Sequence, residues 1–150
     1  MWLDAVLAYL HFTAMFLLFA FLTVQVILIR QPLDMRTVRL LGRMDILYFS
    51  SAMATLVTGF LRATVGAKGA DFYFNAWPIY AKIGLFLAVA VVSVKPTMTF
   101  IRWKRMYERD GAWQVPVDEQ AAMRRLIMVE VHLAALIPIF AVIMSRGLGR

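Results

Sequence analysis

Four long apolar stretches, separated by short polar segments, dominate the pattern of this chain. They run over about residues 3–29, 44–64, 77–101 and 123–145. At about 1.5 Å per helical residue, each stretch is long enough to cross a hydrocarbon core of about 30 Å. The pattern therefore predicts an all-α fold, a four-helix transmembrane bundle, in which residues 1–150 form a single integral membrane domain.

The flanks of these stretches suggest where each helix ends. Pro32 ends the first helix, and Asp34 is placed to cap a short interfacial turn before the second. The third helix is predicted to continue as a basic extension to residue 109, where Gly111 stops it. Pro96 removes one backbone hydrogen bond inside that helix and should bend it.

Composition supports a membrane protein. The chain is 62% apolar and 17% charged, whereas soluble domains are about half apolar. The apolar run at the N-terminus has no preceding lysine or arginine and no cleavage site, so we expect it to remain as the first helix. The chain has no cysteine, which excludes disulfides, thiolate metal sites and iron–sulfur clusters.

Basic residues predict the orientation in the membrane. Most of the 16 lysines and arginines lie in the first and third connections, and such residues favour the cytoplasmic side. Both termini are therefore predicted to lie outside, on the periplasmic side. The net charge of +7 fits this topology and contact with anionic membrane lipid, so we expect no nucleic-acid binding.

The first helix carries a histidine, which is unusual inside a membrane. Asp4, His11 and Gln25 lie at heptad spacing and share one helical face, which we expect to contact protein rather than lipid. His11 lies about 12 Å, and Lys82 of the third helix about 8 Å, from the outer helix ends. The two side chains can therefore lie in one layer, with Asp4 and Gln25 supporting His11. Alternatively, His11 holds helices together and Lys82 extends to the membrane surface.

The fourth helix contains Glu130 and His132. Glu130 and Lys95 lie about 10 Å and 9 Å from the cytoplasmic helix ends, so we predict a structural ion pair between them. His132 is a candidate second iron ligand with His11, although it lies about 8 Å deeper and would need tilted helices. The alternative is that His132 only forms a hydrogen bond with a neighbouring helix.

The second helix supplies further polar residues to the bundle, including Asp45 and Arg62. Tyr48, Thr55 and Arg62 form a stripe at heptad spacing. Ser51, Thr55 and Gly59 form a ridge of small residues, which lets a neighbouring helix approach closely.

Several short motifs carry a resemblance to known families. They are Arg43-Met44-Asp45, Gly59-Phe60-Leu61-Arg62, Gly66-Ala67-Lys68-Gly69, Phe72-Tyr73, Pro96-Thr97, Glu130-Val131-His132-Leu133 and Ser145-Arg146-Gly147. Together they resemble a bacterial family of uncharacterised four-helix inner-membrane proteins, which implies the bacterial inner membrane but no activity.

A weaker similarity is to the HemJ-type protoporphyrinogen oxidases. Leu10-His11 and the segment from Trp77 to Lys82 match the layout of that family, which has a histidine in the first helix and a lysine after a tryptophan in a later one. The tryptophan-to-lysine gap is one residue longer here, and the glycine-rich and tryptophan features of the first helix are missing. The resemblance implies haem or porphyrin binding rather than the oxidase activity itself.

These observations give two functional hypotheses. The first is a protein that binds haem b or a porphyrin and takes part in electron transfer or porphyrin oxidation, with His11 as axial ligand and Lys82 facing carboxylates. The second is a non-enzymatic scaffold, or a transporter of protons or small solutes, that uses the same residues. Membrane lipid, a second copy of the chain, and a porphyrin or quinone are the expected partners. No residue is assigned a catalytic role.

Overall fold

The computed structural model describes residues 2–65 and 77–146, which form four helices. These are α1 (Trp2–Leu28), α2 (Met35–Val65), α4 (Trp77–Arg109) and α5 (Val117–Ser145). Each is long and apolar enough to cross a membrane. The predicted all-α four-helix transmembrane bundle is confirmed.

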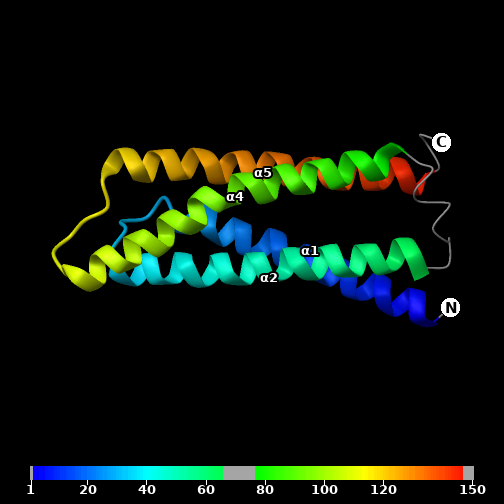
Figure 1. Ribbon diagram of the computed structural model, residues 1–150, viewed down its shortest axis with the longest axis horizontal. Helices are drawn as coiled ribbons and strands as arrows, with labels where there is room; N and C mark the ends of the chain where they lie inside the picture. The colour runs from blue at the N-terminus through cyan, green and yellow to red at the C-terminus, as the bar shows by residue number, and fades with distance from the viewer. Residues whose placement is uncertain (1, 66–76, 147–150) are drawn as a thin grey trace.

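The helices associate as two pairs, α1 with α2 and α4 with α5 (Figure 1). Along its length α4 crosses from α5 to α2, and it changes direction on the way, as expected for a helix with Pro96 in its interior. We call the end with the α1–α2 and α4–α5 connections the basic end. We call the end where α1 begins and α5 ends the terminal end. The two pairs lie farther apart at the terminal end than in the middle of the bundle (Figure 1).

Two helices begin earlier than the hydropathy pattern indicates. Helix α2 starts at Met35, not near Met44, because Asp34 caps this long helix and not a separate short turn. Asp34 Oδ1 accepts a hydrogen bond from the backbone N–H of Thr37 at 2.7 Å. The side chain and backbone N–H of Thr37 hold the pKa of Asp34 below its usual range.

The added first turns of α2 are amphipathic, which explains why hydropathy alone missed them. Val38 and Leu41 are fully buried while Arg36 and Arg39 are exposed. Helix α5 likewise begins at Val117 rather than at residue 123, directly after Pro116. Helices α1 and α4 have the predicted extents to within a residue or so.

The best-packed part of the core lies toward the basic end. Its largest fully buried side chains include Trp103, Phe100, Leu22, Ile29, Leu41 and Ile127. Gln120 of α5 donates hydrogen bonds from Nε2 to the carbonyl oxygens of Ile29 (2.9 Å) and Gln31 (3.0 Å). The hydroxyl of Tyr107 donates to the carbonyl oxygen of Leu33. These bonds satisfy backbone carbonyls where α1 ends and tie the α1–α2 connection to α4 and α5.

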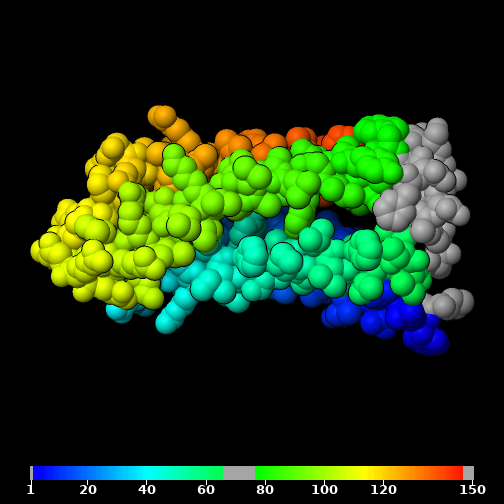
Figure 2. Space-filling model, viewed as in Figure 1, coloured from blue at the N-terminus to red at the C-terminus, as the bar shows by residue number. Residues whose placement is uncertain are grey.

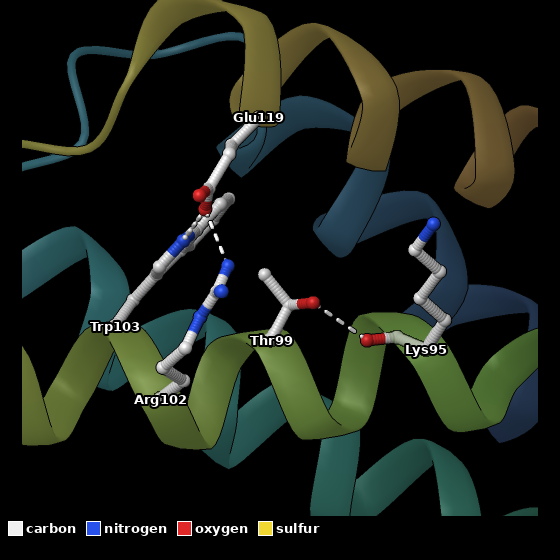
Figure 3. A network of polar contacts seen from close by, with 5 residues as sticks. All are labelled: Lys95, Thr99, Arg102, Trp103 and Glu119. Carbon is white, nitrogen blue, oxygen red and sulfur yellow. Dashed lines mark hydrogen bonds and ion pairs between the residues drawn. The ribbon is translucent and has the colours of Figure 1, made fainter.

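One carboxylate joins α4 to the first turn of α5 (Figure 3). Glu119 Oε2 accepts hydrogen bonds from Arg102 Nη2 at 2.5 Å and from the indole nitrogen Nε1 of Trp103 at 2.8 Å. Because Trp103 is fully buried, Glu119 provides a partner for a donor that water cannot reach.

Candidate functional site

Three basic side chains from three helices approach one another in the half of the bundle toward the terminal end. They are His11 of α1, Arg62 of α2 and Lys82 of α4, which we call the cationic cluster; all three are half-buried. Both Arg62 and Lys82 lie close enough to His11 to interact with it electrostatically, and Arg62 also interacts with Lys82. The expectation that His11 and Lys82 share one layer of the bundle therefore agrees with the structure.

The imidazole of His11 is held by α2. Its Nδ1 lies 3.0 Å from Thr58 Oγ1, and the Thr58 hydroxyl donates its own proton to the carbonyl oxygen of Ala54 at 2.6 Å. The Thr58 oxygen is then an acceptor, which assigns the proton of neutral His11 to Nδ1. His11 also interacts with the backbone of Thr55. An imidazole with its proton on Nδ1 carries its lone pair on Nε2, the form in which that nitrogen binds a metal or accepts a proton.

Gly59 makes room for this imidazole. A Cβ atom at position 59 would lie 3.0 Å from His11 Cε1, closer than such carbon atoms normally pack. The small-residue ridge predicted on this helix therefore has a definite use at Gly59, because it lets the imidazole lie against the backbone of α2.

Arg62 is only partly satisfied by its surroundings. Its guanidinium carbon lies 5.5 Å from the ring centroid of Phe12, in a cation–π contact. Its Nε atom is buried and has no hydrogen-bond partner among the residues that the structure describes. Within the same residues, neither Arg62 nor Lys82 forms an ion pair with a carboxylate.

An opening lies in the same half of the bundle as the cationic cluster. In the space-filling view, a hollow separates the second half of α2 from the first half of α4 (Figure 2). Arg62 and Lys82 belong to these two portions of α2 and α4. This half of the bundle therefore contains both excess positive charge and a space between helices.

A second polar group lies nearer the middle of the bundle and is rich in carboxyls. It consists of Asp45 and Tyr48 of α2, Ser93 and Thr97 of α4, and Glu130 of α5, which we call the carboxyl cluster. The side chain of Glu130 interacts with those of Tyr48 and Ser93 and with the charge of Asp45, and Asp45 interacts with Thr97. Glu130 is 1% exposed, Tyr48 4% and Asp45 7%.

The expected ion pair between Lys95 and Glu130 does not form. The Lys95 side chain is exposed, whereas Glu130 is buried and has no ion pair within the described ranges. In Figure 3 the Lys95 ammonium extends away from α4, and the backbone carbonyl oxygen of Lys95 accepts a hydrogen bond from the Thr99 hydroxyl at 2.8 Å. The exposure of Lys95 and the burial of Glu130 show that the two side chains face different surroundings.

The structure does not bring His132 together with His11, as a shared iron would require. His132 is exposed, and its Nδ1 lies 2.6 Å from the carbonyl oxygen of Met128 on the same helix. Glu130 occupies the buried face of α5, so a residue two positions later points outward. Among the described residues there is no group of three or more histidine, cysteine or carboxylate side chains suited to a metal ion.

Asp4 and Gln25, the other two polar residues predicted on the His11 face of α1, lie at different levels of the helix from His11. Gln25 is 1% exposed, as expected for a protein-facing side chain, and its Nε2 has no hydrogen-bond partner in the described part of the chain. Asp4 is half-buried near the start of α1. Neither side chain is a hydrogen-bond partner of His11 in the structure; Thr58 has that place.

Sequence reasoning missed the residues that join the helices, namely Thr58, Ser93 and Thr97. The heptad stripe of Tyr48, Thr55 and Arg62 was a signal for part of the arrangement. Tyr48 belongs to the carboxyl cluster, and Arg62 belongs to the cationic cluster. Serine and threonine are common in transmembrane helices, so their role becomes visible only when the partner helix is placed.

Comparisons with known proteins identify a family but no activity. No curated protein matches this chain, and no solved structure matches it. A family model described as a predicted membrane protein, DUF2214, matches residues 3–149. The chain therefore belongs to the DUF2214 family of predicted membrane proteins.

Proposed function

We propose that this membrane protein binds haem b or a related porphyrin between its two helix pairs, with His11 as the single protein ligand to iron. The observation that carries the proposal is the mutual approach of His11, Arg62 and Lys82 from three helices. They lie in the half of the bundle where an opening separates α2 from α4 (Figure 2). This arrangement offers one nitrogen ligand and two cations to a flat, largely apolar molecule that bears carboxylates.

The hydrogen bonds of His11 suit an axial ligand. Metal-bound histidines donate the N–H of the ring nitrogen that does not bind metal to an oxygen, which fixes the tautomer and the ring orientation. Thr58 accepts such a bond from Nδ1, so the lone pair is on Nε2. Gly59 leaves the space that the ring occupies against α2.

The charges of the site suit propionate groups. Arg62 and Lys82 interact with each other as like charges in a half-buried place, and this costs free energy unless an anion is bound. Arg62 also has an unused buried donor at Nε. A carboxylate would accept hydrogen bonds from both side chains and offset their repulsion.

The chemistry that follows is electron transfer or porphyrin oxidation. A bound haem would supply the redox change, and the protein would hold its iron through His11 and its carboxylates through Arg62 and Lys82. A quinone is a candidate electron partner, because it is soluble in the same membrane. We place the protein in the bacterial inner membrane, with the terminal end periplasmic and with homo-oligomers as the working assembly.

A haem titration of the purified protein tests the proposal. Wild type should develop a Soret band of ligated haem, and His11→Ala should lose or shift it. His132→Ala is the matched control, because that histidine is exposed, and it should leave the band unchanged. Arg62→Met and Lys82→Met should weaken haem retention without changing the band position, because their partners are carboxylates at the ring edge.

Two results would contradict haem binding. One is a wild-type protein that gives no spectral response to haem, and the other is a His11→Ala spectrum identical to that of wild type. Either result would favour the second hypothesis, a membrane scaffold or a transporter of protons or small solutes, in which the cationic cluster serves another anion or holds the helices together.

A further inference from the structure

The carboxyl cluster points to a second site, separate from the proposed haem site. We propose that Asp45 and Glu130 form a proton-binding site inside the membrane, in which the two carboxyls together hold one proton at neutral pH. The site rests on the placement of the two side chains and on one unsatisfied oxygen, and it stands whether or not haem binds.

Two helices bring the carboxyls together. Asp45 comes from α2 and Glu130 from α5, and each lies within range of the other's charge. Both are buried, and Glu130 is 1% exposed. Its Oε1 atom is buried and has no hydrogen-bond partner among residues 2–65 and 77–146. A buried oxygen left without a partner is unfavourable, and a shared proton would supply one.

No cation balances the pair in the described part of the chain. On α2 the titratable neighbour is Tyr48, and α4 contributes only the hydroxyls of Ser93 and Thr97. Lys95 of α4 is exposed and makes no ion pair with either carboxyl. No charged side chain of α1 takes part in the interactions that involve Asp45 or Glu130.

Electrostatics then favours a proton. Two like charges that are near each other and shielded from water repel more strongly than they would in water. Buried carboxyls that share a site avoid this cost because one of them remains protonated. The pair titrates as a unit, so the proton belongs to both groups.

The surrounding hydroxyls can bind both oxygens of a singly protonated pair. Ser93 donates its own hydroxyl proton to the carbonyl oxygen of Val89 at 2.7 Å, so its oxygen is free to accept a hydrogen bond from the protonated carboxyl. Tyr48 interacts with both Ser93 and Glu130 and can donate to the carboxylate that remains ionised. A proton is the favoured ligand rather than a divalent metal, because the cluster has only two carboxyls and no histidine.

Infrared spectroscopy of the full protein in lipid bilayers tests the proposal. Wild type at neutral pH should show the carbonyl stretch of one protonated carboxyl per chain, shifted by deuterium oxide. Glu130→Gln and Asp45→Asn, which keep the side-chain shapes, should each remove this band or move its titration to a different pH. Glu108→Gln is the matched control, since Glu108 is 45% exposed, and it should leave the band as in wild type.

Three results would overturn the proposal. The first is the absence of any protonated carboxyl in wild type at neutral pH, which does not depend on whether a variant folds. The second is a band that survives in both folded variants. The third is a band that disappears when sodium replaces potassium, because this would assign the oxygens to a sodium ion.

Discussion

Replacing Glu119 tests the packing of the basic end, because one carboxylate oxygen serves two donors there. The ion pair with Arg102 is largely solvent-exposed, with side chains 57% and 32% exposed, and contributes about 0.5 kcal/mol at most. The indole N–H of Trp103 is fully buried, and leaving it unpaired costs about 1–3 kcal/mol. Glu119→Ala should therefore lower the free energy of unfolding by about 1–3.5 kcal/mol, mainly through Trp103.

Three variants separate the two contributions. Glu119→Gln keeps an oxygen acceptor for the indole and loses only the ion pair with Arg102. Arg102→Met loses the same ion pair. Each variant should therefore lower the free energy of unfolding by about 0.5 kcal/mol. Glu108→Ala is the matched control, because it removes a similarly exposed pair with Lys104. The measurement is equilibrium unfolding in mixed detergent micelles, followed by circular dichroism.

A double-mutant cycle decides whether loss of the hydrogen bond from the Trp103 indole causes the destabilisation by Glu119→Ala. Trp103→Phe removes the donor, so adding Glu119→Ala to it should cost about 1 kcal/mol less than adding the same change to wild type. The reasoning fails if the two changes are additive, or if Arg102→Met destabilises the protein as much as Glu119→Ala does.

Further predictions concern single positions. Gly59→Ala should destabilise the contact with His11 by about 1 kcal/mol or more, whereas Gly42→Ala, which has open space at Cβ, should be neutral or stabilising in the same unfolding assay. Asp34→Ala should destabilise the start of α2 at neutral pH. Because the folded state holds the pKa of Asp34 below its usual range, this difference should vanish as the pH falls through that lowered pKa. Lys95→Met should change stability by less than about 0.5 kcal/mol, since the residue is exposed and has no carboxylate partner among residues 2–65 and 77–146; a loss of about 3 kcal/mol would restore the ion-pair hypothesis.

The sequence was sufficient to predict the number and class of the helices, because a membrane requires long apolar runs and satisfied backbone groups. It was not sufficient to predict where α2 and α5 begin. Their first turns are amphipathic, with Val38 and Leu41 buried beside exposed arginines. Hydropathy detects the part of a helix that crosses lipid, whereas capping by Asp34 decides where α2 begins.

Depth along the helices was easier to predict than direction around them. Counting residues placed His11 and Lys82 in one layer, in agreement with their interaction in the structure. The same counting placed Lys95 level with Glu130, but rotation about α4 turns Lys95 outward. His132 could have been recognised as exposed once Glu130 was taken as buried, since residues two apart on a helix face different sides.

The most direct test of the central claim is to extract the wild-type protein, purified from native membranes, with acidified organic solvent and to identify the extracted molecules by mass spectrometry. The proposed function predicts haem b or another carboxylate-bearing porphyrin in the extract, in an amount approaching one per chain and strongly reduced for His11→Ala. An extract without porphyrin, from protein that also gives no spectral change with added haem, would contradict it.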